Sequence, residues 1–286
     1  MTIFHYINGN IEEKSCAQIN VLDLGLLRGY GVFDYVSLYK GRPFYLRAHI
    51  DRLQISAKQI QLELPMSIMQ IERAALDVIE KNEPIDAGLR FIITGGLSGG
   101  DLLLPEGKSS LMILFHPLTP YSIEHYTNGM RAVTTSELRY LPHVKTTNYI
   151  SAIFAMKKAL AANANDALYL NCDGGILEGT TCNVFFVKKG TLITSDSPQI
   201  VRGVTREIIL NLAKNHYPIE YREVSVEETS SCDEAFLTSS LKDVMQLVQI
   251  DNQKIGNGRP GSISAHLRSL FHAYIENYFH AQKVSV

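Results

Sequence analysis

A proline-rich segment divides the chain into two parts, and this division constrains the fold more than any other feature. Residues 116–120 read His-Pro-Leu-Thr-Pro, and two prolines so close together interrupt a regular strand and stiffen the chain. A chain of 286 residues is long for one compact core and suits two domains. We therefore predict an α+β protein with an N-terminal α+β domain over residues 1–116, a linker over 117–121 and a C-terminal α/β domain over 122–286.

The spacing of apolar residues predicts that strands and helices mix in both parts. In the first part, strands are expected over residues 4–7, 32–39, 44–46, 87–94 and 110–115, and helices over 49–61 and 67–81. In the second part, strands are expected over residues 130–134, 167–170, 183–188, 220–224 and 234–237, and helices over 149–162, 205–214 and 262–278.

Composition and charge exclude several classes of protein. Hydrophobic residues make up 45% of the chain and charged residues 20%, with a formal net charge of -2, which is typical of an ordinary globular protein. No long run of Lys or Arg occurs, so neither nucleic acid nor an anionic membrane is an expected partner. No stretch of about 18 apolar residues occurs, so no membrane span is expected, and the first residues lack the pattern of a signal peptide.

The four cysteines are not spaced as metal ligands or as a redox pair. They are Cys16, Cys172, Cys182 and Cys232, with no C-x-x-C pair and no His at ligand spacing. We expect reduced and mostly buried thiols in a cytoplasmic protein without a metal ion.

Lys145 stands between an expected strand and an expected helix, in the segment Lys-Thr-Thr-Asn-Tyr. Most lysines at such positions are solvated surface residues. The functional alternative is an amine nucleophile, because Lys forms an imine with an aldehyde when burial or cationic neighbours lower its pKa.

Glu178 follows a glycine-containing turn and precedes Gly179. It is either a turn residue between two strands or a buried carboxylate that pairs with a protonated ring nitrogen.

Thr205 and Arg52 also have two interpretations each. Thr205 lies at the start of an expected helix, where it is either an N-cap or part of a phosphate site made by the first N–H groups. Arg52 either pairs with a carboxylate on its own helix face or grips a phosphate through its planar fork.

Taken in order along the chain, these clusters resemble the fold-type IV, or class IV, pyridoxal-phosphate enzymes. That family contains branched-chain aminotransferases, D-amino acid aminotransferases and aminodeoxychorismate lyases. The resemblance extends from Tyr-Ile-Asn-Gly at residues 6–9 to Gly-Asn-Gly-Arg-Pro-Gly at residues 256–261. It implies a two-domain α+β fold that binds pyridoxal 5'-phosphate in the cleft between the domains, with the cofactor lysine in the C-terminal domain.

The resemblance also implies the residues that bind the cofactor. Lys145 resembles the lysine that holds it as a Schiff base, and Tyr149 resembles the tyrosine that hydrogen-bonds its phenolic oxygen. Glu178, in Leu-Glu-Gly-Thr-Thr-Cys-Asn, resembles the partner of the pyridine nitrogen. The residues expected around the phosphate are Arg52, Val204, Thr205 and Ser240.

Three residues are implied at the substrate. Phe33 resembles an aromatic wall of the pocket, Leu241 lies beside the expected site of the substrate carboxylate, and Arg90 resembles an arginine near the side-chain carboxylate of glutamate. The D-amino acid enzymes carry an arginine where this chain has a glycine, in Ile-Thr-Gly-Gly at residues 93–96. Arg28 is unusual for the family, and it either adds a charge to the pocket or lies on the surface.

The activity implied by the resemblance is transfer of an amino group between an amino acid, branched-chain or otherwise apolar, and a 2-oxo acid such as 2-oxoglutarate. Aminodeoxychorismate lyase activity, which gives 4-aminobenzoate, and D-amino acid transamination are the alternatives within the family. A binding protein that kept the fold without catalysis is the alternative from another class. The resemblance further implies a homodimer, and the glycine- and leucine-rich run at residues 95–105 is the candidate loop between subunits.

Overall fold

The computed structural model describes residues 1–284 of the chain. These residues form two compact units. The first unit contains Met1–Thr119 and Val144–Asn148, and the second contains Pro120–His143 and the chain from Tyr149 onward. The boundary after Thr119 falls inside the expected linker. The segment Val144–Asn148 belongs to the first unit. Lys145 therefore lies in the first unit, whereas it was expected in the C-terminal domain.

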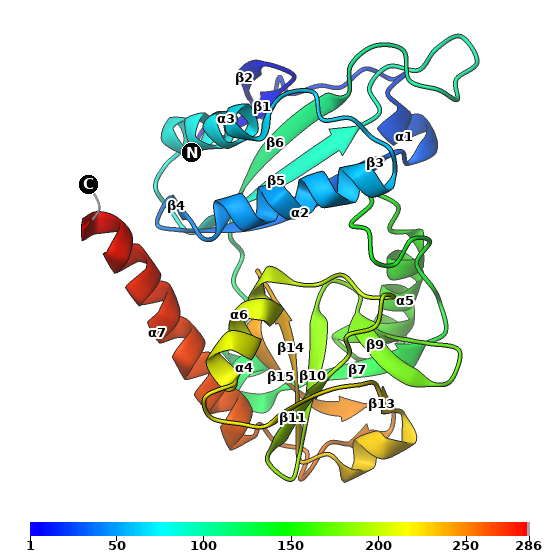
Figure 1. The fold of residues 1–286 in the computed structure, drawn as a ribbon, viewed down its shortest axis with the longest axis vertical. Helices are drawn as coiled ribbons and strands as arrows, with labels where there is room; N and C mark the ends of the chain where they lie inside the picture. The colour runs from blue at the N-terminus through cyan, green and yellow to red at the C-terminus, as the bar shows by residue number, and fades with distance from the viewer. Residues whose placement is uncertain (285–286) are drawn as a thin grey trace. The chain divides into compact units, whose positions relative to one another are not determined.

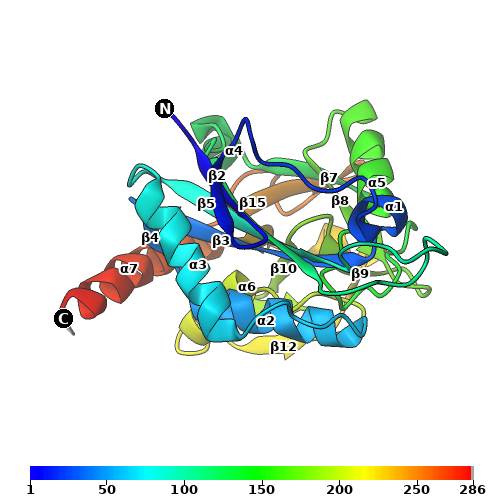
Figure 2. The ribbon, with the colours of Figure 1, turned by 90° about the horizontal axis from the view of Figure 1, so that it is seen from above.

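The first unit is a single sheet with helices packed against it. Its sheet has the strand order β2-β1-β6-β5-β3-β4. The strands are β1 (Phe4–Ile7), β2 (Asn10–Glu13), β3 (Gly31–Tyr39), β4 (Arg42–Pro43), β5 (Ala87–Thr94) and β6 (Ser110–Pro117). The helices are α1 (Leu24–Arg28), α2 (Leu46–Gln59) and α3 (Ile68–Lys81). Helices α2 and α3 pack on the same face of the sheet (Figure 1, Figure 2).

Local sequence explains why these helices form where they do. In α3, Ser67 and Gln70 make a capping box that satisfies N–H groups at the first turn. In α2, the buried residues Leu46, Ile50, Leu53 and Ala57 recur at helical spacing and face the sheet.

Two expectations for the first unit are wrong in detail. The strand expected over residues 44–46 does not form, because Tyr45 adopts a left-handed conformation with φ 56° and Leu46 begins α2. Strand β6 extends to Pro117, beyond the expected end at residue 115, because Pro117 at the end of the strand pairs with Ala87.

The second unit is built around a closed ring of strands. The strands are β7 (Met130–Thr135), β8 (Asp166–Leu170), β9 (Gly175–Gly179), β10 (Asn183–Lys188), β11 (Thr191–Thr194), β12 (Ile219–Tyr221), β13 (Val224–Ser225), β14 (Glu234–Ser239), β15 (Asp243–Ile250) and β16 (Gln253–Lys254). The helices are α4 (Ile123–Asn128), α5 (Ile150–Ala161), α6 (Val204–Ala213), the 3₁₀ helix η1 (Glu227–Ser231) and α7 (Ser262–Val284). The ring runs through β10, β14, β15, β7, β8 and β9, and the pairing of Glu178 with Asn183 closes it.

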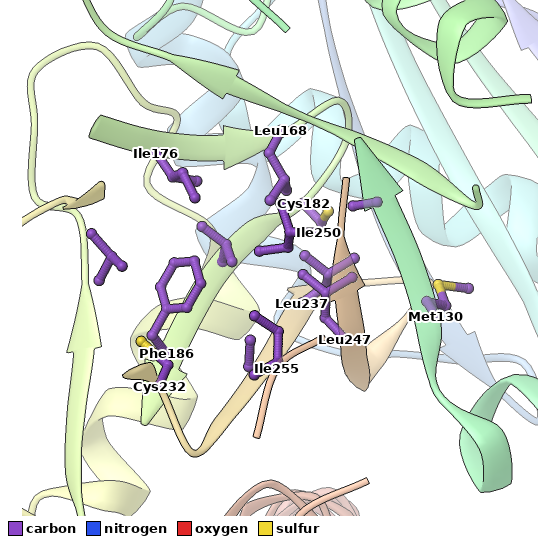
Figure 3. Packing of buried hydrophobic residues seen from close by; sticks show 14 of the residues in the cluster. Met130, Leu168, Ile176, Cys182, Phe186, Cys232, Leu237, Leu247, Ile250 and Ile255 are labelled. Atoms are coloured by element: carbon purple, nitrogen blue, oxygen red, sulfur yellow. The ribbon is translucent and has the colours of Figure 1, made fainter. Parts of the chain in front are cut away.

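The core of the second unit fills this ring. Figure 3 shows side chains from several strands of the ring meeting in one apolar cluster that includes Leu168, Phe186, Leu237 and Leu247. A second cluster lies between α5 and its neighbouring strands and contains Ala155, Ala159 and Ala167 among others. Burial of these apolar side chains stabilises the ring whose ends carry the polar residues described below.

Several expectations for the second unit are confirmed and one is wrong. Strand β10 has the expected bounds, and β7, β8 and β14 contain the expected strands. The single strand expected over residues 220–224 is two strands, β12 and β13, because Arg222 and Glu223 turn between them and the two strands pair with different neighbours.

The cysteines and the apolar segments give two further outcomes. Cys182 and Cys232 are buried but Cys16 and Cys172 are exposed, so the expectation of mostly buried thiols holds for only half of them. Within residues 1–284, none of the helices has both the length and the apolar character needed to cross a membrane.

Candidate active site

Lys145 lies on a segment that pairs with strand β3 in the first unit. The N–H of Phe33 donates to the Lys145 carbonyl at 2.9 Å, and the N–H of Thr147 donates to the Gly31 carbonyl at 2.9 Å. A side chain at position 31 would place its Cβ 2.8 Å from the Ile93 carbonyl oxygen, so a glycine is needed there. These hydrogen bonds hold the backbone that directly follows the Lys145 side chain against β3.

The Lys145 amine lies over an aromatic ring. Its Nζ atom is 4.6 Å from the centroid of the Phe33 ring, and the Arg90 guanidinium is 5.4 Å from the same ring. Arg90 also lies 5.8 Å from the ring of Tyr35, its neighbour across the β3–β5 pair. The structure therefore brings together Lys145, Phe33 and Arg90, which the sequence assigned to the cofactor and the substrate.

Arg52 on α2 forms a two-pronged ion pair with Asp34 on β3. Its Nε and one terminal nitrogen each lie 2.8 Å from an Asp34 oxygen. The Asp34 side chain is fully buried and the Arg52 side chain is 18% exposed, so this is not a surface ion pair on one helix face. His49 completes the cluster, with Nδ1 at 2.8 Å from Asp34 Oδ1.

The charges of this cluster follow from its burial. Burial alone would raise the pKa of Asp34, but Arg52 and His49 outweigh it and hold that pKa well below its usual range. Burial is the main cause that lowers the pKa of His49, and the charges of Arg52 and Lys145 lower it further against the opposing effect of Asp34. We therefore assign an ionised Asp34 and a neutral His49 whose Nδ1–H donates to it.

Glu178 lies at the end of β9 in the second unit and is 5% exposed. Its Oε1 atom is paired with the buried guanidinium of Arg139. Its Oε2 atom accepts from the side-chain amide of Asn183 at 3.2 Å and from the Val201 N–H at 3.1 Å. Glu178 is therefore a buried carboxylate held by cationic and neutral donors, and not an exposed turn residue.

Asn183 connects Glu178 to the start of α6. Its amide donates to the Val201 carbonyl at 2.8 Å, and a Cβ at Gly203 would lie 2.3 Å from its Oδ1 atom. Gly203 is the N-cap of α6, so no side chain caps the first N–H groups, and Thr205 in that turn is buried. The helix start suits a phosphate, and Thr205 is not the N-cap residue.

The other assigned residues of the second unit are Tyr149, Ser240 and Leu241. Tyr149 is the N-cap of α5. Ser240 is partly buried and Leu241 is 39% exposed, and both lie in the turn between β14 and β15.

A buried ion pair holds the turns next to these residues. Lys242 Nζ lies 3.2 Å from Asp166 Oδ2, and both side chains are almost completely buried. Asp166 also accepts from the hydroxyl of Thr180 at 2.7 Å and from the thiol of Cys182 at 3.3 Å, and Lys242 donates to the Thr181 hydroxyl at 3.2 Å. The pair therefore binds the three residues that precede Asn183 and the turn that carries Ser240.

Burial and charge act in opposite directions on this pair. Burial would raise the pKa of Asp166, but Lys242 and the surrounding donors lower it. Burial would lower the pKa of Lys242, but the neighbouring Cys182, Asp166 and Tyr121 groups raise it. Both directions favour the charged forms, so we describe Asp166–Lys242 as an ion pair.

Sequence reasoning missed the polar partners in both units. It gave no role to Asp34, His49, Arg139, Asp166 or Lys242, because each gains its role from a contact with another segment and none stands in a distinctive pattern. Arg28 is exposed at the end of α1, where its guanidinium donates to the Leu27 carbonyl at 2.9 Å. Its position in this chain is that of a surface residue.

The first unit carries a half-buried lysine, and the second carries a buried carboxylate and an uncapped helix start. A family model of amino-transferase class IV matches residues 31–250, and the chain belongs to this family of transaminases, which use pyridoxal phosphate.

Individual relatives agree with this assignment along nearly the whole chain. A protein of Methanocaldococcus jannaschii, named provisionally as a branched-chain-amino-acid aminotransferase, is 32% identical over 93% of this chain and 94% of its own length. A D-alanine aminotransferase of Bacillus licheniformis is 28% identical over 92% of this chain and 93% of its own length. A solved structure of the Escherichia coli branched-chain amino acid aminotransferase has a TM-score of 0.89 and 27% identity, and the match covers 96% of this chain and 94% of that one.

Proposed function

We propose that the chain transfers an amino group between a branched-chain or other apolar amino acid and a 2-oxo acid such as 2-oxoglutarate, with pyridoxal 5'-phosphate as cofactor. The observation that carries the proposal is the arrangement of Lys145, Phe33 and Arg90, in which a lysine amine and an arginine lie over one aromatic ring. An amine nucleophile, an apolar wall and a carboxylate-binding cation are what this reaction requires of the protein.

The residues present suit each part of the cofactor. The start of α6 offers backbone N–H groups and the buried Thr205 to a phosphate, and Arg52 and Ser240 are the further phosphate residues of the proposal. The Lys145 amine suits the aldehyde. Glu178 suits a protonated pyridine nitrogen, because it is a buried carboxylate that Arg139 and Asn183 hold in place. Tyr149 is assigned to the phenolic oxygen, and Val204 to the phosphate.

The bound cofactor supplies an electron sink that stabilises negative charge at the substrate carbon. The chain's own residues then position the substrate and move the proton. Lys145 Nζ, when it is not bonded to the cofactor, would accept and hold the proton from the substrate carbon. Glu178 would be the carboxylate partner of the ring nitrogen, and Arg139 holds Glu178 in place.

The assigned substrate residues differ in chemistry. Phe33 offers an apolar ring to an aliphatic side chain. Arg90 is the cation for the second carboxylate of glutamate or 2-oxoglutarate, and Leu241 lies beside the assigned site of the substrate carboxylate. The nearness of the Arg90 guanidinium to the Phe33 ring is consistent with alternate binding of an acidic and an apolar substrate.

D-alanine transamination is the second candidate, and the 28% identity to the Bacillus licheniformis enzyme favours it. The glycine pair at residues 95–96, where the D-amino acid enzymes carry an arginine, favours the first candidate. Mixing the cofactor-loaded protein with L- and D-amino acids separately distinguishes them, because only a substrate removes the visible absorption of the bound cofactor. Release of pyruvate from aminodeoxychorismate without amino transfer to an acceptor would instead identify a lyase.

The role of Lys145 has a direct test. Borohydride reduction of the cofactor-loaded protein, followed by peptide mass mapping, should place the pyridoxyl mass on Lys145. A label on another lysine, or no label on a protein that binds the cofactor, would contradict the assignment. Lys158 is a useful internal reference, because its amine donates a hydrogen bond to the Thr134 carbonyl at 2.8 Å.

We further propose that the working enzyme is a homodimer. Leu103 and Leu104 in the candidate loop are 62% and 63% exposed, and Ile153 and Phe154 on α5 are also more than half exposed. Apolar surface of this kind favours association. Leu103→Asp should weaken the dimer in light scattering, whereas Ile55→Asp, at a 60% exposed site outside the loop, should not. If the dimer is equally strong in both variants, the loop is not part of the dimer interface.

A further inference from the structure

The second unit contains a cavity beside the first turns of α7 that has no role in the proposed reaction. Its volume is about 610 Å³, which is in the range of small-molecule sites. Gln246 on β15, Tyr126 on α4, and Arg268 and His272 on α7 line it, and every lining residue belongs to this unit. None of them is assigned above to the cofactor or the substrate.

Gln246 places a buried acceptor in this cavity. The alternate residues Met245 and Leu247 of β15 face the core of the strand ring, so Val244 and Gln246 project from the other face, against which α7 packs. Gln246 is only 6% exposed, and among the described residues its Oε1 atom has no hydrogen-bond partner. An unsatisfied buried carbonyl is unfavourable and indicates a donor that the protein itself does not provide.

The orientation of the Gln246 amide is fixed by its neighbour. Its Nε2 atom donates to the Gly261 carbonyl oxygen at 3.3 Å. Exchanging the amide nitrogen and oxygen would place the Gln246 oxygen against the Gly261 carbonyl oxygen, which is unfavourable. The Gln246 atom without a hydrogen-bond partner is therefore the oxygen, Oε1.

Arg268 supplies a cation without a countercharge. Its guanidinium carbon lies 3.9 Å from the centroid of the Tyr126 ring, and its Nε atom is buried without a hydrogen-bond partner. No carboxylate in the described part of the chain pairs with it, since the nearby Asp243 pairs with His272 at 3.0 Å. A guanidinium stacked on a ring presents its in-plane N–H groups to a carboxylate.

We propose that this cavity binds a small zwitterion of the α-amino acid type. Its carboxylate accepts from Arg268, its ammonium group donates to Gln246 Oε1, and its side chain lies against the apolar wall that includes Val244 and Ala265. Phosphate or a simple dicarboxylate would satisfy Arg268 but would place negative charge against the Gln246 oxygen. The proposal does not depend on the substrate assigned to the active site.

The experiment uses 2-aminoisobutyrate, an α-amino acid without a hydrogen on the α carbon, which therefore cannot be transaminated. Equilibrium dialysis of the labelled compound against the cofactor-loaded enzyme should show a binding event that Arg268→Gln and Gln246→Leu each weaken by at least about tenfold, as expected for a charge-assisted contact. Arg259→Gln removes the same charge from an exposed neighbouring position and should bind as the unaltered enzyme does.

The outcomes separate the possible explanations. The proposal is overturned if the enzyme and both cavity variants bind the compound equally. It is also overturned if no part of the binding to the unaltered enzyme is lost in these variants. Displacement by inorganic phosphate at similar concentration would identify a general anion site and would also overturn it. Amino transfer by Arg268→Gln should be unchanged in the absence of the probe, so that loss of the cavity site is distinguished from failure of the proposed function.

Discussion

The two units both bury a carboxylate against a cation, but they use it differently. In the first unit, the flat guanidinium of Arg52 contacts both oxygens of Asp34 and holds one helix against one strand. In the second unit, the amine of Lys242 contacts Asp166 and the Thr181 hydroxyl and holds two turns together. A guanidinium has a rigid fork, whereas an ammonium group directs its donors to separate partners.

This difference shows how each unit presents its reactive groups. In the first unit the charge of Lys145 acts on His49 of the cluster. Phe33 and Arg90 lie on the paired strands β3 and β5, and Lys145 lies on a segment that is hydrogen-bonded to β3. In the second unit Glu178 lies at the end of β9 and Ser240 lies in the turn between β14 and β15. The ion pair holds that turn together with the three residues that precede Asn183. We therefore expect the second unit to be more sensitive to loss of its cation.

Loss of Lys242 should have the largest effect. Lys242→Met leaves the buried Asp166 carboxylate without a cation, which should reduce the free energy of unfolding by about 3–5 kcal/mol. Urea denaturation measures this change, and Asp166→Asn combined with Lys242→Met should recover part of it. An unchanged midpoint for Lys242→Met would show that the two turns do not depend on the pair and would remove the contrast between the units.

Loss of charge at Glu178 should have the next largest effect. Glu178→Gln should lower the rate of amino transfer about a hundredfold, as when one charge-stabilising group is removed, because a neutral amide does not hold the proton on the ring nitrogen. Cofactor affinity, measured by fluorescence titration, should be retained. Glu137→Gln, at an exposed position in the same unit, is the control, and full activity of Glu178→Gln would refute the role.

Changes at Arg52 should sharpen the comparison by separating its two possible uses. If Arg52 also binds phosphate, Arg52→Ala should weaken cofactor affinity about tenfold to a hundredfold, the value of a charge-assisted contact. Arg52→Lys keeps the charge but loses the fork, so it should recover part of the affinity while the contact with Asp34 remains weakened. If both variants lower the unfolding midpoint without changing the cofactor dissociation constant, Arg52 acts only through Asp34.

Much of the fold was predictable because it depends on local patterns. Helix α3 has helical periodicity and a capping box, and β5 is a run rich in apolar residues, and both appear as expected. Strands β9, β11 and β15 were not predicted. Strand β15 carries buried residues on both faces and so shows no alternation of polar and apolar residues, and β9 is short and rich in glycine.

The sequence by itself determined the family, the order of the candidate residues and the identity of Lys145 and Glu178 as candidates, because those depend on motifs within a few residues. Only the tertiary structure decided which groups they contact. Glu178 is buried against Arg139, Arg52 is bound to Asp34, and Lys145 belongs to the first unit. Each of these facts depends on chain segments that are brought together by sheet pairing and core packing, and the free energy of a buried charge is set by such neighbours and not by adjacent residues.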